Sequence, residues 1–143
     1  AFMQRNKEYL HEVADKYADV TAHTLAALIK QESGGDPKAV SRTGAIGVGQ
    51  LTKYIYLQHR DENRDTTFWE AINPHQEQPA IDRAAAYLQD LYDSSSTEAE
   101  VFAKYNQGPQ FRNQTGRQYP TDVLEKRRDI DKYFLDDRLL ASR

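Results

Sequence analysis

Cysteine is absent from this chain of 143 residues. Its absence excludes disulfide bonds and thiolate metal sites, and it leaves the cellular compartment open. Long hydrophobic runs are missing as well, since no segment approaches the ~20 apolar residues that a transmembrane helix needs. The first residues also lack the charged, apolar and small-residue regions of a signal peptide. We therefore expect no transmembrane segment and no signal peptide in this chain.

Basic residues are not in excess. The 19 Lys and Arg residues are outnumbered by 22 Asp and Glu residues, which gives a net charge of −3. A general nucleic-acid-binding protein normally carries a basic surplus. The basic run at residues 126–128 lies between Glu125 and Asp129, and we interpret it as a solvated helix face rather than a phosphate site. We expect no nucleic-acid binding by this domain.

Alternating β-branched residues, which are typical of strands, are also lacking. Most of the chain instead has the apolar periodicity of helices. This spacing predicts helices over residues 6–18, 21–33 and 80–92, between Thr97 and Gly108, and from about 120 onwards, with a short helix near 53–58. Thr21 is a predicted N-cap, and Thr97 with Glu100 fits a capping box. We predict a single all-α domain over residues 1–143, with at most a minor β element, which can be a fragment of a larger protein.

One carboxylate stands out in the second predicted helix. Leu25, Leu28, Ile29 and Glu32 recur at positions i, i+3, i+4 and i+7, so they share one helix face. Three of them suit a core, the fourth is an acid, and two glycines that can end the helix follow directly. Partial burial there would raise the pKa of Glu32 and keep it protonated near neutral pH, as a general acid requires. A glutamate that simply faces solvent is the alternative that spacing alone leaves open.

A glycine-rich loop follows, with glycines at positions 44, 47 and 49. Glycines at this density let the backbone approach a ligand closely. The loop lacks the Lys-Ser/Thr ending of a phosphate-binding P-loop and follows a helix instead of a strand, so we expect no nucleotide binding. Ser41 and Gln50 flank the loop and can hydrogen-bond to the hydroxyls and amides of a sugar. Loop solvation and turn formation explain both side chains equally well.

Together, these segments resemble a known family. Glu32-Ser33, Ser41, Gly-Ala-Ile-Gly-Val-Gly-Gln at 44–50 and Tyr-Asn-Gln-Gly at 105–108 follow the order of motifs in lysozyme-like soluble lytic transglycosylases. That family typically shows Glu-Ser, a Ser nine residues on, Gly-Ala-x-Gly-Leu-Met-Gln and later Ala-Tyr-Asn-Ala-Gly. The resemblance implies a lysozyme-like α-domain with a substrate groove. It also implies cleavage of the β-1,4 bond between N-acetylmuramic acid and N-acetylglucosamine, with a 1,6-anhydro-muramyl product.

The resemblance further implies a setting and roles for individual residues. The partner would be peptidoglycan glycan strands, in the periplasm or cell wall, with no cofactor; the oligomeric state stays open. Glu32 would protonate the leaving oxygen and then accept the proton of the muramyl C6 hydroxyl as it attacks C1, while Tyr105 would orient Glu32 or the N-acetyl group. Catalytic roles thus fall on Glu32 and Tyr105. The implied substrate-binding positions are Ser33, which would also brace the helix end, Ser41, Gly47, Gly49, Gln50 and Asn106.

Some positions depart from the family's pattern. Gly49 stands where the family usually has Met, and Lys104 replaces the usual Ala. Ala80 and Ala84 stand where many members have Asn and Gly. We expect the missing side chain at position 49 to open the floor of the saccharide groove. The Asn-Pro pair at 73–74, residues 80–86 and the Tyr-Asn-Gln-Gly motif resemble the transglycosylase domain of phage internal virion proteins, which would place the domain in a virion.

Three other functions compete with this one. A hydrolytic muramidase would use the same Glu32 with water as the attacking group, and its candidate helpers are Asp36, Asp61 and Asp65. A non-catalytic wall-binding or virion structural domain would keep the fold alone. A metal enzyme is disfavoured, because His11-Glu12 lacks the second histidine of a His-Glu-x-x-His site and the remaining histidines show no ligand spacing. We expect no metal.

Overall fold

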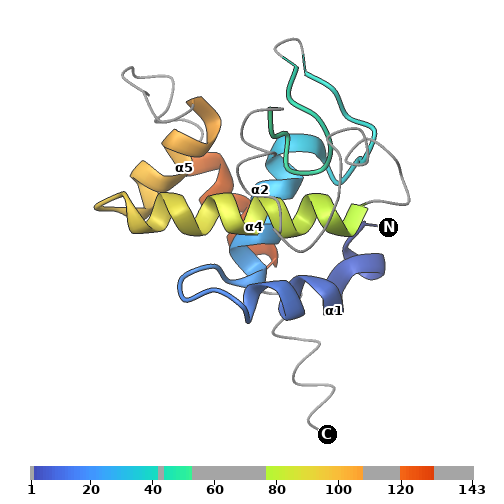
Figure 1. Ribbon diagram of the computed structural model, residues 1–143, viewed down its shortest axis with the longest axis horizontal. Helices are drawn as coiled ribbons and strands as arrows, with labels where there is room; N and C mark the ends of the chain where they lie inside the picture. Colours follow the sequence, from blue (N-terminus) through green and yellow to red (C-terminus); the bar gives the residue numbers. More distant parts are fainter. Residues whose placement is uncertain (1, 42–43, 53–76, 108–119, 131–143) are drawn as a thin grey trace, which may run out of the picture.

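In the computed structural model of this chain, the described residues are 2–41, 44–52, 77–107 and 120–130 (Figure 1). Several predictions fall outside these residues and stay predictions. They are the short helix near 53–58, the candidate helpers Asp61 and Asp65, and the last glycine of the motif at 105–108.

Helices dominate the described part of the chain. They are α1 (Phe2–Ala14), α2 (Ala22–Ser33), α4 (Glu77–Asp93), α5 (Glu98–Gln107) and a further helix over 120–130. Among the described residues, β structure is limited to the isolated bridges Val40–Ile46 and Ile46–Leu51. The predicted all-α fold with a minor β element is therefore confirmed. None of the described helices combines the length and the apolar character needed to cross a membrane.

The long helix α4 organises the packing. It contacts both α1 and α5, and α1 also packs against α2. In Figure 1, α2 crosses behind α4, so that its first turns lie on the α1 side and its last turn lies on the opposite side, with the loop at 44–52. The inward face of α4 carries Ile81, Ala84, Ala85 and Leu88, all fully buried. The small side chains of the two alanines let other elements approach α4 closely.

Helix α2 begins and ends where its sequence predicts. The Thr24 N–H donates to the Thr21 hydroxyl over 3.1 Å, which makes Thr21 the N-cap. Gly34 has a φ of +65°, and its N–H donates to the Lys30 carbonyl over 3.0 Å. This left-handed ending favours glycine. The stripe of Leu25, Leu28 and Ile29 is fully buried, so α2 crosses the core and delivers its last turn to the surface.

The first helix is predicted over 6–18, whereas α1 spans Phe2–Ala14, so this prediction is wrong at both ends. Phe2 is buried against Gly35, where an added Cβ atom would lie 2.6 Å from the Phe2 Cβ atom. Asn6 is also buried and donates to the Phe2 carbonyl over 3.2 Å and to the Glu77 carboxylate. The buried face therefore starts at Phe2. After Ala14 the chain turns tightly toward α2.

A polar network joins four helices on the far side from the α2 C-terminus. Arg127 of the helix over 120–130 binds both carboxylate oxygens of Glu98 over 2.8 Å each and donates to the Thr24 hydroxyl over 3.0 Å. Tyr92 of α4 donates to the same Glu98 carboxylate over 2.7 Å. For Arg127, the interpretation of residues 126–128 as a solvated helix face is therefore wrong, because its guanidinium group is turned toward Glu98.

This network predicts a pH dependence of stability. The hydrogen bond from Arg127 lowers the pKa of Glu98 below its ordinary value, and the Tyr92 hydrogen bond acts in the same direction. A lowered folded-state pKa stabilises the fold above the unfolded-state pKa, and this contribution is lost as the pH falls through the folded-state pKa. In urea unfolding, we expect Glu98→Gln to reduce the free energy of unfolding at neutral pH by less than ~1 kcal/mol, because the carboxylate is partly solvated.

The difference between wild type and Glu98→Gln should shrink as the pH falls from about 5 to about 3. Glu12→Gln, at an exposed position on α1, is the matched control. If Glu98→Gln lowers the free energy of unfolding by the same amount over this whole pH range, the stabilisation does not come from the charged pair of Glu98 and Arg127.

Candidate active site

Glu32 lies in the last turn of α2, at the boundary between core and solvent. Its stripe partners Leu25, Leu28 and Ile29 are fully buried, whereas Glu32 is half-buried. The helix ends two residues later at Gly34. This places the carboxylate where a solvent-borne substrate can reach it, while apolar packing holds its backbone. The charge of Glu32 is also one of the causes that raise the pKa of Tyr105, so the two groups lie near each other.

Tyr105 of α5 is the second group of the site. It is buried, and its hydroxyl donates to the Gly49 carbonyl over 2.7 Å. Burial raises the pKa of Tyr105 well above its ordinary value, and the negative charge of Glu32 and then the neighbouring Tyr87 add to this shift. The phenol is therefore neutral at any working pH, and its one proton is committed to Gly49. This arrangement suits an anchor between α5 and the loop rather than a proton donor or acceptor.

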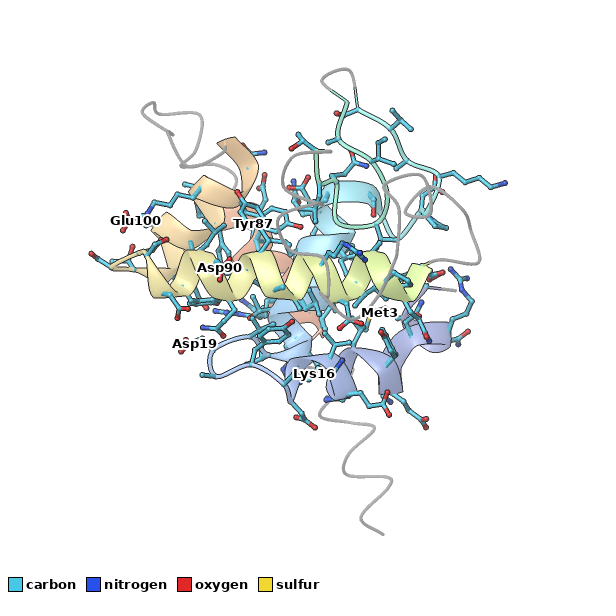
Figure 2. All side chains as sticks on the ribbon, in the orientation of Figure 1. Met3, Lys16, Asp19, Tyr87, Asp90 and Glu100 are labelled. Carbon is cyan, nitrogen blue, oxygen red and sulfur yellow. The ribbon has the colours of Figure 1, made fainter. Side chains whose placement is uncertain are left out.

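Sequence reasoning missed Tyr87, which supports Tyr105. The two rings lie 5.2 Å apart between centroids and are tilted by 42°. Figure 2 shows Tyr87 on the side of α4 that faces α5, whereas Lys16 and Asp19 lie on the α1 side. Burial raises the pKa of Tyr87 to about 12. Its spacing of three residues from Ala84 was the available signal, because i and i+3 share a helix face.

The loop at 44–52 is held by hydrogen bonds of its own backbone and of Gln50. The Gln50 side-chain amide donates to the Ala39 carbonyl over 3.0 Å and to the Gly47 carbonyl over 2.9 Å. Gly47 has a φ of +82°, and its N–H donates to the Ala39 carbonyl over 2.9 Å. Gln50 itself has a φ of +51°, an uncommon value for a residue other than glycine. Both amide hydrogens of Gln50 thus bind backbone carbonyls, one in the loop and one at Ala39 before it, which leaves its amide oxygen as the group that can face a ligand.

The two serines of the predicted site also bind backbone groups. The Ser33 hydroxyl donates to the Val48 carbonyl over 2.7 Å and accepts from the Gly35 N–H over 3.1 Å. It therefore ties the helix end that carries Glu32 to the loop. The Ser41 hydroxyl accepts from the Ala45 N–H over 3.0 Å and closes the turn before the loop. Contacts of either serine with a substrate stay predictions.

Gly49 does not open the groove floor as the sequence suggested. A Cβ atom at this position would lie 2.9 Å from the Ala84 Cβ atom and 3.0 Å from the Tyr105 hydroxyl oxygen. A side chain here would therefore start toward α4 and α5, in the interior, and not toward open space. The expectation of a removed floor residue is wrong, because the space next to Gly49 is already filled by Ala84.

Comparison with known proteins identifies the family. The family model described as the transglycosylase SLT domain matches residues 8–126. The chain belongs to the transglycosylase SLT domain family. The predicted family is thus confirmed, and the matched range includes Glu32, the loop and Tyr105. The finer resemblance to phage internal virion proteins stays a prediction.

Solved structures share the fold of this SLT domain. One is lytic transglycosylase Slt from Pseudomonas aeruginosa, crystallised as an inactive glutamate-to-glutamine mutant, with a TM-score of 0.74 and 21% identity. Another is the 70 kDa soluble lytic transglycosylase from Escherichia coli, with a TM-score of 0.73 and 18% identity. Each match covers 88% of this chain and 24% of the other, so the chain spans about a quarter of those proteins.

Most of the predicted site residues of this SLT domain come together. Ser33, Gly49 and Tyr105 form a continuous series of contacts from the end of α2 through the loop to α5, and Glu32 lies at its start. Asn106 differs, because its side chain is exposed on the last turn of α5. Within the described ranges, no three His, Asp or Glu side chains are grouped as a metal ion would require.

Proposed function

We propose that this SLT domain is a peptidoglycan lytic transglycosylase that cleaves the β-1,4 bond between N-acetylmuramic acid and N-acetylglucosamine. The observation that carries the proposal is the half-buried Glu32 at the end of a buried helix, beside the neutral Tyr105 and a hydrogen-bonded glycine loop. Both similar structures are of lytic transglycosylases, and the Pseudomonas aeruginosa protein is described as inactive when a glutamate is replaced by glutamine. Its site of action is the cell wall, and carriage in a virion is the finer version of the proposal.

Glu32 acts twice in this reaction. It first donates its proton to the glycosidic oxygen of the leaving sugar. As a carboxylate, it then accepts the proton of the muramyl C6 hydroxyl while that oxygen bonds to C1, so the product is a 1,6-anhydro sugar and no water is consumed. Each correctly placed proton transfer contributes about 10²–10⁴-fold in rate. Attack by a hydroxyl of the same sugar replaces a second carboxylate, because well-oriented internal groups reach effective molarities of about 10⁵–10⁸ M.

The loop and the end of α5 supply the saccharide contacts in this proposal. Gln50 uses both amide hydrogens on the Ala39 and Gly47 carbonyls, so it meets a sugar hydroxyl or N–H through its amide oxygen, as an acceptor. Asn106 is exposed and offers both a donor and an acceptor. Ser33, Ser41, Gly47 and Gly49 contribute by holding the backbone between these groups in place.

The products decide between transglycosylation and hydrolysis. We expect purified sacculi digested by this domain to release muropeptides with 1,6-anhydro-muramyl ends, which mass spectrometry distinguishes from hydrolysis products because they are lighter by one water. An internal nucleophile adds no solvent oxygen, so digestion in H₂¹⁸O should leave these ends unlabelled. Reducing muramyl ends that carry ¹⁸O, without the anhydro product, would instead identify a muramidase. Intact sacculi under all conditions would favour a non-catalytic binding domain.

A further inference from the structure

Two small residues on different elements lie against each other beside the candidate site. They are Gly49 in the loop at 44–52 and Ala84 on α4. We infer that Gly49 and Ala84 form a size-matched pair that positions the Gly49 carbonyl, and through it the Tyr105 hydroxyl, beside Glu32. The inference concerns positioning residues and rests on the proposed function for its activity readout.

Space, and not backbone conformation, requires glycine at position 49. Positive φ values are found at Gly34, Gly35, Gly44 and Gly47 among the described glycines, and Gly49 is not one of them. A side chain at position 49 meets Ala84 instead, since the two Cβ atoms would be 2.9 Å apart. The Ala84 Cβ atom is fixed to a buried helix backbone and cannot rotate away. A methyl group on either side of this contact therefore excludes one on the other.

The contact controls the acceptor of the Tyr105 hydroxyl. Gly49 carries the carbonyl to which Tyr105 donates over 2.7 Å, and the same hydroxyl oxygen would lie 3.0 Å from an added Cβ atom. If position 49 gains a methyl group, the loop must move away from α4, and the carbonyl moves with it. The buried phenol then loses its partner, which is unfavourable for a polar group shielded from water. The Val48 carbonyl, next to Gly49 in the chain, accepts from the Ser33 hydroxyl over 2.7 Å, so the displacement also reaches the helix end that carries Glu32.

The inference predicts rescue by a second substitution. We expect Gly49→Ala to lower the turnover rate at least about tenfold with a smaller change in KM, since misplacement by ~1 Å can cost about 10²-fold. Adding Ala84→Gly should restore most of the rate, because it removes the shorter of the two close contacts. Ala85→Gly is the matched control, since Ala85 is equally buried on the same helix and is not among the atoms close to position 49. This control should restore nothing.

A second comparison separates positioning from general packing. In a Tyr105→Phe background no hydroxyl donates to the carbonyl of residue 49. Gly49→Ala should therefore lower the activity much less in this background than it does in the wild type. Equal losses in both backgrounds would show that position 49 does not act through Tyr105. If Gly49→Ala alone fails to fold, recovery of folding with Ala84→Gly and not with Ala85→Gly supports the pair. Failure of both double variants overturns it.

A spectroscopic measurement tests the pair independently of activity. Tyrosine labelled with ¹³C at the ring carbon that bears the hydroxyl gives a signal for Tyr105, which Tyr105→Phe identifies. The signal should shift in Gly49→Ala and return in Gly49→Ala/Ala84→Gly. An unchanged signal in Gly49→Ala would overturn the inference. The signal can shift as expected while the wild type fails to cleave sacculi. That result would refute the proposed function and leave the pair intact.

Discussion

Replacing Glu32 by glutamine is expected to lower peptidoglycan cleavage by at least about 10³-fold, because one carboxylate supplies both proton transfers and each is worth about 10²–10⁴-fold. Glutamine has the same shape but neither donates an acidic proton nor accepts one at C6. The side chain is half-buried at the end of α2, beyond the buried stripe that holds the helix in the core. The melting temperature should therefore stay close to that of the wild type. Release of soluble muropeptides from purified sacculi and thermal unfolding by circular dichroism measure the two quantities.

Asp36→Asn is the matched control for Glu32→Gln. Asp36 is exposed on the turn after α2, close in sequence to Glu32, and its carboxylate accepts the Lys38 N–H over 2.9 Å, a bond that asparagine can keep. Under the proposed mechanism this variant keeps its activity. Equal losses in Asp36→Asn and Glu32→Gln would indicate a two-carboxylate hydrolase. Full activity of purified Glu32→Gln would remove Glu32 from the catalytic role altogether.

Tyr105→Phe is expected to lower the cleavage rate by about 10- to 100-fold, because a lost donor to a buried carbonyl costs about 1–3 kcal/mol. The phenylalanine ring can keep its packing on Tyr87, whose ring centroid lies 5.2 Å away, so the change is confined to the hydroxyl. The Gly49 carbonyl loses its hydrogen bond, and the loop is no longer fixed to α5 beside Glu32. Single-turnover rates and melting temperatures should both fall.

Tyr87→Phe is the control for this substitution, since it removes a phenol hydroxyl from the same pair of rings without touching the bond to Gly49. We expect its effect on the rate to be smaller than that of Tyr105→Phe. A Tyr105→Phe variant that is less stable but cleaves at the wild-type rate would limit Tyr105 to a structural role. Burial keeps the phenol of Tyr105 neutral, so its ionisation should contribute no step to the pH profile of the cleavage rate. We therefore expect the pH profile of Tyr105→Phe to have the same shape as that of the wild type.

Local signals in the sequence predicted the elements whose ends are set locally. Thr21 caps α2 through a residue three positions on, and Gly34 ends it through a carbonyl four positions back, so both interactions lie within one turn. The start of α1 was missed because Phe2 is buried against Gly35, far away in the sequence. The partner of Arg127 was missed for the same reason, since Glu98 belongs to another helix.

The candidate site was predicted by residue type, and its connections were not. The motif resemblance pointed to Ser33, Ser41 and Gln50 as polar groups near Glu32, but a sequence shows donors and acceptors without their partners. The structure shows that these side chains bind backbone groups of the loop. The sequence predicts a missing side chain at Gly49, whereas the space next to Gly49 is filled by Ala84, which lies on a different element. Pairwise contacts across the fold are the information that residue spacing lacks.

The two hydrogen bonds from the Gln50 amide bear on how the domain meets its ligand. A loop without regular secondary structure usually loses conformational entropy when a ligand orders it, and that loss weakens binding. Here Ala39, Gly47 and Gln50 are already linked, and the left-handed backbone of Gln50 is fixed before any ligand arrives. The rim of the proposed groove is therefore preorganised. A glycan strand would bind a surface that is already in shape, and its binding free energy would remain available for distorting the sugar ring at the bond to be cleaved.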